Sequence, residues 1–340
     1  MSVVSVSIVI PTLNSEAVLS ACLRSIRCQK YSQSAIQIIV VDGGSEDQTI
    51  EVAKSFGAVV LENSLRTAEA AKALGCSVAT EDIVAFIDSD NVLSGDDWLL
   101  KMLAPFSDPS IDASEPLGWD VGYAGLSLID RYCALTGVND PFCLYLGNYG
   151  RYSYLTSRWT DYEFDTIERP GYFFLTIVPG DRIPTMGANG FLIRRLVLVD
   201  VIRGPFLFDI DMIGELVTAR GSLKVARVHT SIAHLYARDW LQYYRKAQRR
   251  ARDYYFYSDS GDRSYPWHEL AKGTAVLFVL DSLLVIPSCA QAIKGFRRVP
   301  DSAWLFHPIA CLLTAFAYVG ATIRARLLGP QMHSRVGWRQ

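Results

Sequence analysis

Two aspartates, Asp88 and Asp90, are separated by one residue and come directly after the apolar run Ile83–Ile87. A carboxylate pair with this spacing can bind a divalent cation through one member, while the other holds a ribose or a water of the ion's second shell. A cation held there would neutralise the charge of a departing diphosphate. An isolated Asp-x-Asp is more often a solvated turn, but its position after a buried strand favours a metal site over that alternative.

Further polar side chains are candidates for chemistry. Asp42 follows an apolar run and precedes two glycines, which suits either a carboxylate that accepts from a nucleobase or a turn aspartate that ends a strand. Asp209 and Asp211 stand at the start of a predicted helix, where they either cap the helix or provide a general base for an acceptor hydroxyl. His229 and His234 flank a short apolar segment. One of them is a candidate metal ligand, with a surface histidine as the alternative.

The elements that position these residues alternate between strands and helices. Each predicted strand is apolar throughout, which indicates a parallel sheet covered on both faces. Ligands of such sheets bind at the carboxyl ends of the strands, so we expect Asn14, Asp42 and Asp88 at one crevice. Ser45 and Gln48 have the spacing of a helix capping box. The predicted strands are Val6–Ile10, Ile36–Val41, Ala58–Leu61 and Ile83–Ile87, and a helix is predicted over Thr67–Val78.

Length and composition limit the class of protein. The 340 residues suffice for two average domains or for one large α/β domain with an appendage. A net charge of -2 gives no support to nucleic-acid binding. The seven cysteines are odd in number and form no C-x-x-C pair, which indicates reduced cytosolic thiols. The first residues lack a basic region and Pro11 interrupts the first apolar run, so no signal peptide is predicted.

Two regions beyond residue 100 lack the strand and helix alternation. Residues 105–185 are rich in Tyr, Gly, Pro and Arg, which predicts a long irregular insertion that carries binding function. The predicted helix Arg238–Arg252 carries six basic residues against Asp239. Arg245 and Arg249 share its basic face and are candidate ligands for a diphosphate or an anionic lipid, with a solvated charged face as the alternative.

Two apolar segments follow, Gly273–Ile293 and Ser302–Ile323, and each is long enough to span a membrane. Asp281 and Pro287 disfavour the first segment as a span. If both segments crossed, their basic connector would face outside, against the positive-inside bias. A helical hairpin that lies in the inner leaflet avoids this conflict. Two buried helices that close the globule or mediate a dimer are the alternative.

Several segments, taken in order, resemble the family 2 inverting glycosyltransferases of the nucleotide-sugar, GT-A type. Their order and spacing are specific in combination, and the resemblance covers residues 4–240. The segments are Val6–Asn14, Ile39–Ser45 with Asp47 and Thr49, Phe86–Asp90, Gly187–Gly190, Phe208–Asp211 and His234.

The resemblance implies a fold and a donor site. The fold is GT-A, an α/β architecture with a Rossmann-like, mostly parallel sheet and helices on both faces, followed here by C-terminal apolar helices. The donor is a nucleotide-diphosphate sugar, with Asp42 beside the nucleoside and Asp88 near the ribose. The donor residues that the resemblance implies are Pro11, Thr12, Asn14, Asp42, Lys72, Asp88 and Ser89.

The resemblance also implies the metal site and the acceptor side. Asp90, together with His234, would bind Mg²⁺ or Mn²⁺, and Asp211 would act as the general base. The inverting reaction then needs one displacement, with the base opposite the leaving group. The acceptor residues that it implies are Gly187, Ala188 and Asn189.

The sequence departs from the family pattern at three places. Ile210 stands directly before the catalytic aspartate, where the family usually has an acidic residue, so Asp209 remains a rival base. Lys72 retains a cation in its segment, but the amide of the family pattern is absent. Gln248–Arg250 lacks the tryptophan of processive relatives, so we expect the transfer of one sugar at a time.

The expected function is metal-dependent, inverting transfer of one sugar to a hydroxyl of a glycan or polyprenyl-linked saccharide. We expect it at the cytoplasmic face of the plasma membrane, with no nucleic-acid partner, and a homo-oligomer remains open. One alternative is a sugar-phosphate nucleotidyltransferase, which would need a Gly-rich basic loop where Pro11–Asn14 stands. The other is a non-catalytic membrane-bound subunit that keeps the fold.

The expected organisation begins with a catalytic domain over residues 1–235, in which 1–100 bind the nucleotide and 101–235 bind the acceptor. A basic amphipathic helix and linker would cover 236–268. The hairpin would cover 269–328, and a short tail 329–340.

Overall fold

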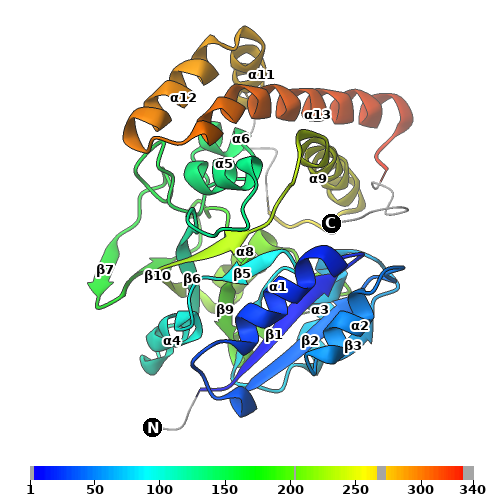
Figure 1. Ribbon diagram of the computed structural model, residues 1–340, viewed down its shortest axis with the longest axis vertical. Helices are drawn as coiled ribbons and strands as arrows, with labels where there is room; N and C mark the ends of the chain where they lie inside the picture. Colours follow the sequence, from blue (N-terminus) through cyan, green and yellow to red (C-terminus); the bar gives the residue numbers. More distant parts are fainter. Residues whose placement is uncertain (1–3, 203, 266–272, 332–340) are drawn as a thin grey trace. The chain divides into compact units, whose positions relative to one another are not determined.

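The computed structural model describes residues 4–202, 204–265 and 273–331 (Figure 1). The chain forms two compact units. Of the described residues, those up to Asp120 and those of Glu163–His234 form unit 1, and those of Val121–Tyr162 and from Leu235 to Gln331 form unit 2. The prediction differs from this division, because it placed 121–162 in the acceptor half of one domain over 1–235. Apolar side chains of this segment, such as Tyr132, instead pack against the C-terminal helices.

One sheet of ten strands forms the centre of unit 1. Its order is β3-β2-β1-β4-β9-β6-β10-β8-β7, with β5 paired to β10. The strands β3, β2, β1 and β4 are parallel, as their uniformly apolar sequences predict, and β9 and β8 run antiparallel to their neighbours. In Figure 1 the blue strands β1 to β3 lie at one edge of the sheet. The strands are β1 Val6–Thr12, β2 Ile36–Asp42, β3 Val59–Glu62, β4 Ile83–Phe86, β5 Asn91–Leu93, β6 Ala113–Trp119, β7 Thr166–Arg169, β8 Tyr172–Ile177, β9 Phe191–Arg194 and β10 Leu223–His234.

Helices of unit 1 pack on this sheet through small or apolar faces. Helix α3 lies against β1 and β2, and Gly75 allows the close approach, because a Cβ there would come within 2.3 Å of Val9 Cγ1. Thr67 caps α3, and its side chain accepts from the Ala70 N–H, so the predicted helix over Thr67–Val78 is confirmed to within one residue. The helices and short 3-10 turns are α1 Glu16–Arg27, η1 Gln33–Ala35, α2 Thr49–Ser55, α3 Ala68–Val78, α4 Trp98–Leu103, η2 Ala104–Ser107, α7 Arg195–Leu198 and α8 Asp209–Arg220.

Two local predictions are wrong. Ser45 does not cap a helix with Gln48, because α2 begins at Thr49 and has no side-chain cap; the Ser45 hydroxyl is used by Asp42 instead. Residues 105–185 are not one irregular insertion, because they contain three strands of the sheet and two helices. The strand pattern there is masked by Glu, Pro and Gly in β6 (Ala113–Trp119) and by polar residues in the edge strand β7 (Thr166–Arg169).

Unit 2 is helical within its described residues. Aromatic side chains from separate segments form its core, among them Tyr132, Tyr243, Trp304 and Phe306. Asp140 is buried in this unit, where Arg250 Nη1 donates to its Oδ2 at 2.8 Å and the Tyr318 hydroxyl donates to the same carboxylate. The helices are α5 Leu128–Thr136, α6 Phe142–Leu146, α9 Trp240–Ser260, α11 Thr274–Leu284, α12 Ile286–Arg298, the 3-10 turn η3 Ser302–Phe306 and α13 His307–Leu328.

The first predicted apolar segment is broken in two. Helices α11 and α12 meet at Val285, whose φ is 64°, directly before Pro287 in the first turn of α12, and their axes differ by 83°. Among the described residues, Ser302–Leu328 is the one unbroken helix that is long and apolar enough to cross a membrane, and 44% of its most apolar window is buried inside the protein. Length and composition by themselves do not distinguish a span from a core helix.

Candidate active site

Asp42, the last residue of β2, organises the loops after β1 and β2. Thr12 ends β1 and is the register partner of Asp42. Asp42 Oδ1 accepts from Thr12 Oγ1 at 2.9 Å and Ser45 Oγ at 2.5 Å, and its Oδ2 accepts from the N–H groups of Gly44 and Ser45 at 2.9 and 2.7 Å. A carboxylate has about four acceptor positions, so these bonds occupy all of them. A contact to a nucleobase, which stays a prediction, requires one bond to be shared or exchanged.

Asn14 joins the same two loops from the β1 side. Its φ of 49° is left-handed, a conformation that Asn tolerates better than most residues. The Asn14 N–H donates to Ser45 Oγ at 2.7 Å, and its Oδ1 accepts from the Glu46 N–H at 2.8 Å. Pro11 and Thr12, the other predicted donor residues of this loop, are buried at the end of β1. The predicted donor loops therefore form one hydrogen-bonded unit, in which the residue that sequence reasoning misread is Ser45.

The Asp-x-Asp segment is a tight turn after β4. Its ends are tied because Asn91 N–H donates to the Asp88 carbonyl at 2.9 Å and the Asp88 N–H donates to Asn91 Oδ1 at 3.0 Å. Ser89 is buried, and its hydroxyl lies 3.2 Å from that of Ser15 in the β1 loop. Asn91 Nδ2 donates to Asn189 Oδ1 at 3.0 Å. Sequence reasoning missed Asn91, although its position in the first polar cluster after a buried strand was the available signal.

The two predicted metal ligands lie together. Their side chains are buried, and His234 Nε2 lies 3.3 Å from Asp90 Oδ1. The pairing of β5 with β10 brings them together, since Asn91 is the register partner of His234. The Trp119 ring packs on the His234 ring with centroids 4.8 Å apart, which fixes the imidazole beside the carboxylate.

These two side chains fit a divalent ion. Ligand atoms at about 2.1 Å from an ion and at right angles are roughly 3 Å apart, close to the observed 3.3 Å between Asp90 and His234. Carboxylate oxygen suits both Mg²⁺ and Mn²⁺, whereas imidazole nitrogen suits transition metals better. In the described part of the chain, no cluster of three or more His, Cys, Asp or Glu residues forms a metal site. An ion here would therefore need oxygen ligands from substrate and water.

Lys72 contacts Asp209 across 137 residues of sequence. Its Nζ lies 2.5 Å from Asp209 Oδ1, and the two side chains are 5% and 36% exposed. Burial by itself would lower the pKa of Lys72, but the charges of Asp209 and Asp88 outweigh it and raise that pKa above its ordinary value. Lys72 is therefore a fixed cation between α3 and α8. Its predicted contact to the donor stays a prediction, and its partner inside the protein is Asp209.

Asp209 and Asp211 have different surroundings in the first turn of α8. Burial raises the pKa of Asp209 to about 6, the Lys72 charge opposes the rise, and the Asp88 carboxylate adds to it. The exposed third of the Asp209 side chain limits this effect. Asp211 is 2% exposed, and residues two apart on a helix do not share a face. The ion pair with Lys72 therefore engages Asp209. That Asp211 is the base, with Asp209 as its rival, stays a prediction.

The turn Gly187–Gly190 lies between α8 and the Asp-x-Asp turn. Gly187 has a φ of 103°, and a Cβ on it would come within 2.8 Å of the Asp209 carbonyl oxygen, so only glycine fits. At the other end, the Gly190 N–H donates to the Phe86 carbonyl of β4 at 2.8 Å. The predicted acceptor residues are thus held against both the predicted base helix and the predicted metal turn, all within unit 1.

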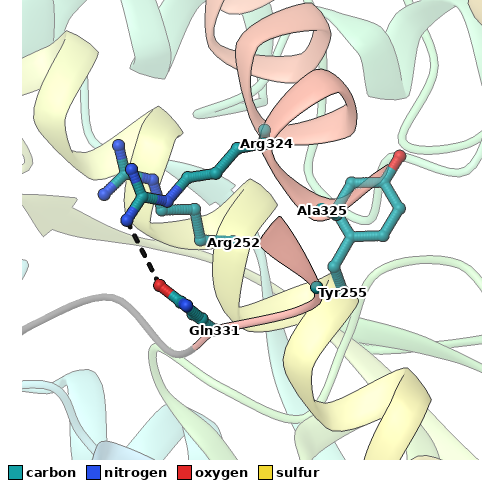
Figure 2. Close-up of a pocket in the computed structure, with 7 residues that line it drawn as sticks. Arg252, Tyr255, Arg324, Ala325 and Gln331 are labelled. Carbon is teal, nitrogen blue, oxygen red and sulfur yellow. Dashed lines mark hydrogen bonds between the residues drawn. The ribbon is translucent and has the colours of Figure 1, made fainter. Parts of the chain in front are cut away.

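The predicted phosphate or lipid ligands Arg245 and Arg249 belong to α9 of unit 2 and are at least partly exposed. Figure 2 shows a small hollow further along this helix, where Arg252 of α9 and Arg324 of α13 face the same space. Arg324 Nη2 donates to Gln331 Oε1 there at 3.2 Å. The hollow has a volume of about 10 Å³, which holds about one water. It cannot be the donor site.

Comparisons with known proteins agree with this geometry. Residues 7–114 match the family model described as Glycosyl transferase family 2. The chain is 28% identical over 142 residues to glycosyltransferase AglE of Haloferax volcanii, covering 39% of this chain and 45% of that relative. It is 34% identical over 104 residues to a PGL/p-HBAD biosynthesis glycosyltransferase of Mycobacterium bovis, covering 29% of this chain and 40% of that relative. The chain therefore spans less than half the length of these curated relatives.

A solved structure supports the fold over nearly the whole chain. Mannosyltransferase PcManGT from Pyrobaculum calidifontis, in complex with GDP-Man and Mn²⁺, aligns with a TM-score of 0.54 over 96% of this chain and 88% of that chain. At 14% sequence identity, this likeness concerns the fold only. The predicted α/β fold of GT-A type is confirmed, while the roles of the individual site residues stay predictions.

Proposed function

We propose that the chain, whose residues 7–114 match the model of glycosyl transferase family 2, moves one sugar from a nucleotide-diphosphate sugar to a hydroxyl of a glycan or polyprenyl-linked saccharide, with inversion at the anomeric carbon. The observation that carries the proposal is the connected set of polar contacts in unit 1. Hydrogen bonds join Asn14 to Ser45, Ser15 to Ser89, and Asn91 to Asn189. The loops that carry the proposed donor, metal and acceptor residues are therefore hydrogen-bonded to one another.

In this mechanism, each group of the chain has a separate task. The loops around Asn14 and Asp42 bind the nucleotide, and Asp90 with His234 would hold Mn²⁺ or Mg²⁺. When bound, the ion supplies neutralisation of the charge on the leaving diphosphate. Asp211 accepts the proton of the acceptor hydroxyl as its oxygen attacks the anomeric carbon. The donor bond breaks as the new bond forms, so a single displacement inverts the configuration and no residue is glycosylated.

A ligand screen followed by a transfer assay tests the proposal. The purified chain is mixed with UDP, GDP, ADP, CDP or dTDP, each with and without Mn²⁺, and its melting temperature is measured. We expect one diphosphate to stabilise the chain, and more so with Mn²⁺, because stabilisation follows affinity. The matching nucleotide sugars are then assayed with polyprenyl-linked and free saccharides. No transfer by the wild-type chain from any of them would favour a non-catalytic subunit.

We also propose that unit 2 attaches the enzyme to the cytoplasmic face of the plasma membrane. Exposed apolar residues follow a helical spacing along α13, and a second set lies on α11. The two sets are Ile309, Phe316, Val319, Ile323 and Leu327 on α13, and Val276, Leu277, Leu280, Leu283 and Leu284 on α11.

The charges near these helices favour a helix pair that lies in the membrane plane. A hollow of about 420 Å³ on α12 is lined by Lys294, Arg297, Arg298 and two apolar residues, which suits an anionic lipid headgroup. The 83° bend between α11 and α12 prevents this pair from forming one straight span. The proposal therefore has apolar side chains in the leaflet and basic side chains at the headgroups.

A vesicle assay is expected to distinguish membrane binding from dimerisation. Replacing Phe316 and Ile323 of α13 by Asp should abolish co-sedimentation with vesicles of phosphatidylglycerol and phosphatidylcholine, because both side chains are half-exposed on one face. The matched control replaces Leu196, which is 74% exposed in unit 1, by Asp. This change should leave co-sedimentation with the vesicles unaltered. If the double variant instead converts a dimer into a monomer without changing vesicle binding, the apolar face is a subunit interface.

A further inference from the structure

A charged pair that sequence analysis did not single out lies in the middle of the sheet. Glu115 of β6 and Arg227 of β10 are register partners, and their side chains are 1% and 0% exposed. Arg227 Nη1 donates to Glu115 Oε2, and its Nη2 lies 3.4 Å from the Pro116 carbonyl. Both charged side chains of this ion pair are thus shielded from solvent.

Stability does not explain this pair. Removing two charges from water is costly, and buried ion pairs can be replaced by apolar residues of similar volume with little loss of stability. Val225, two residues before Arg227 and therefore on the same face of β10, is apolar and fully buried, so an apolar side chain would suit this environment. A charged pair in this place therefore needs a reason other than packing.

Glu115 has a second contact that reaches toward the site. While Oε2 accepts from Arg227, Oε1 accepts from the Gly187 N–H at 3.2 Å. Gly187 is the residue whose missing side chain leaves room for the Asp209 carbonyl. A chain of contacts therefore links Arg227 to Glu115 and Glu115 to Gly187, the first residue of the turn Gly187–Gly190. Gly187 in turn packs against the first turn of α8, which carries Asp211.

We propose that Glu115 is a positioning residue for sugar transfer, and that Arg227 orients its carboxylate. Glu115 fixes the Gly187 N–H, and the turn that begins there sets the acceptor residues and the first turn of α8 relative to the Asp-x-Asp turn. Neither side chain touches the reacting atoms. The inference rests on the proposed function to the extent that Asp211 is the base, but the fixed Gly187 amide is a property of the fold that can be measured separately.

Two matched double variants isolate the contact to Gly187. In Glu115→Gln/Arg227→Met, both charges are gone, but the Gln carbonyl can still accept from the Gly187 N–H. In Glu115→Met/Arg227→Met, both charges and the acceptor are gone, and the side-chain volume is similar. A role that acts through Gly187 predicts different behaviour of these two proteins, whereas a role in packing or charge predicts the same behaviour.

The expected result is a loss of kcat in the Met/Met variant with little change in KM for the donor. A small displacement of reacting groups can lower the rate by roughly a hundredfold, so we expect kcat to fall about ten- to a hundredfold. The Gln/Met variant should stay within about threefold of the wild type. Equal kcat values in the two variants would overturn the proposal.

Amide hydrogen exchange gives a readout that does not depend on activity. The Gly187 N–H should exchange faster in the Met/Met variant than in the wild type and in the Gln/Met variant. If the wild type transfers no sugar, the proposed function fails, and the exchange result still decides whether Glu115 fixes the turn. If the Met/Met variant does not fold, Glu115→Asp serves instead, because it keeps a charge near Arg227 and shortens the reach to Gly187. Unchanged exchange at Gly187 in that variant would also overturn the proposal.

Discussion

Replacing Asp211 by Asn is expected to lower kcat for sugar transfer by about 10²- to 10⁴-fold, the range that a general base contributes. Asn keeps the size of the side chain but cannot accept the proton of the acceptor hydroxyl. The KM for the donor and the melting temperature with nucleoside diphosphate should change little, because Asp211 contacts neither the nucleotide nor the ion in the proposed mechanism. Initial rates at saturating donor, with varied acceptor, measure the effect.

Asp209→Asn tests the rival base in the same assay. Its carboxylate is engaged by Lys72, so we expect a smaller loss of kcat, caused by the loss of that ion pair. The pKa of Asp209 is about 6 because burial raises it. If Asp209 were the base, kcat would fall as the pH drops through about 6, since only the deprotonated carboxylate can accept a proton. Two results together would assign the base to Asp209. Asp209→Asn would lose activity, including the dependence of kcat on a group with a pKa of about 6, and Asp211→Asn would keep normal activity.

Removing the divalent ion is expected to have the second large effect. Chelation by EDTA should abolish transfer, and Asp90→Asn should lower kcat/KM by roughly 10²- to 10³-fold at limiting Mn²⁺, since a bound ion stabilises transition-state charge by several kcal/mol. Added Mn²⁺ should restore part of the activity, because His234 remains as a ligand. At the same limiting concentration, Mn²⁺ should also raise the melting temperature of this variant less than that of the wild type in the presence of nucleoside diphosphate, because its affinity is lower.

Asp96→Asn is the matched control for Asp90→Asn. Asp96 is an exposed aspartate of unit 1 that pairs with Lys30 at the surface, so the same chemical change there should leave activity and metal dependence intact. Full activity of the wild type in EDTA would refute metal dependence and would leave Asp90 and His234 as a hydrogen-bonded pair. We also expect a preference between the two ions. Because one ligand of the site is an imidazole, transfer should be faster with Mn²⁺ than with Mg²⁺.

Several parts of the fold and site could be predicted from the sequence because they depend on the types of residues that are adjacent in the chain. The runs Val6–Ile10, Ile36–Val41 and Ile83–Ile87 are apolar over a strand length and end at polar turns, and all three are buried parallel strands. Residues 7–114 match the model of the family that these segments resemble. Asp90 and His234, which the resemblance implied as metal ligands, lie in contact.

Other parts could not be predicted because they depend on partners far apart in the chain. Three strands in 105–185 escaped prediction, since β6 contains Pro116 and Gly118 and is completed by hydrogen bonds to β10. Ser45 was expected to cap a helix because the capping box is a local spacing, but the Asp42 carboxylate beside it competes for the same hydroxyl. A local pattern gives the possible partners of a polar group and does not decide between them.

The amino-acid order by itself determined which segments become the parallel strands, which loops carry carboxylates, and which family residues 7–114 resemble, because apolar periodicity and motif spacing act over neighbouring residues. Only the tertiary structure decided that Lys72 pairs with Asp209, that Glu115 and Arg227 are buried together, and that residues 121–162 belong with the C-terminal helices. Each of these depends on which charged or apolar groups meet when water is excluded. These partners are set by the packing of the whole chain, because a buried charge or apolar face is stable only against a suitable partner, and the fold determines which partner lies beside it.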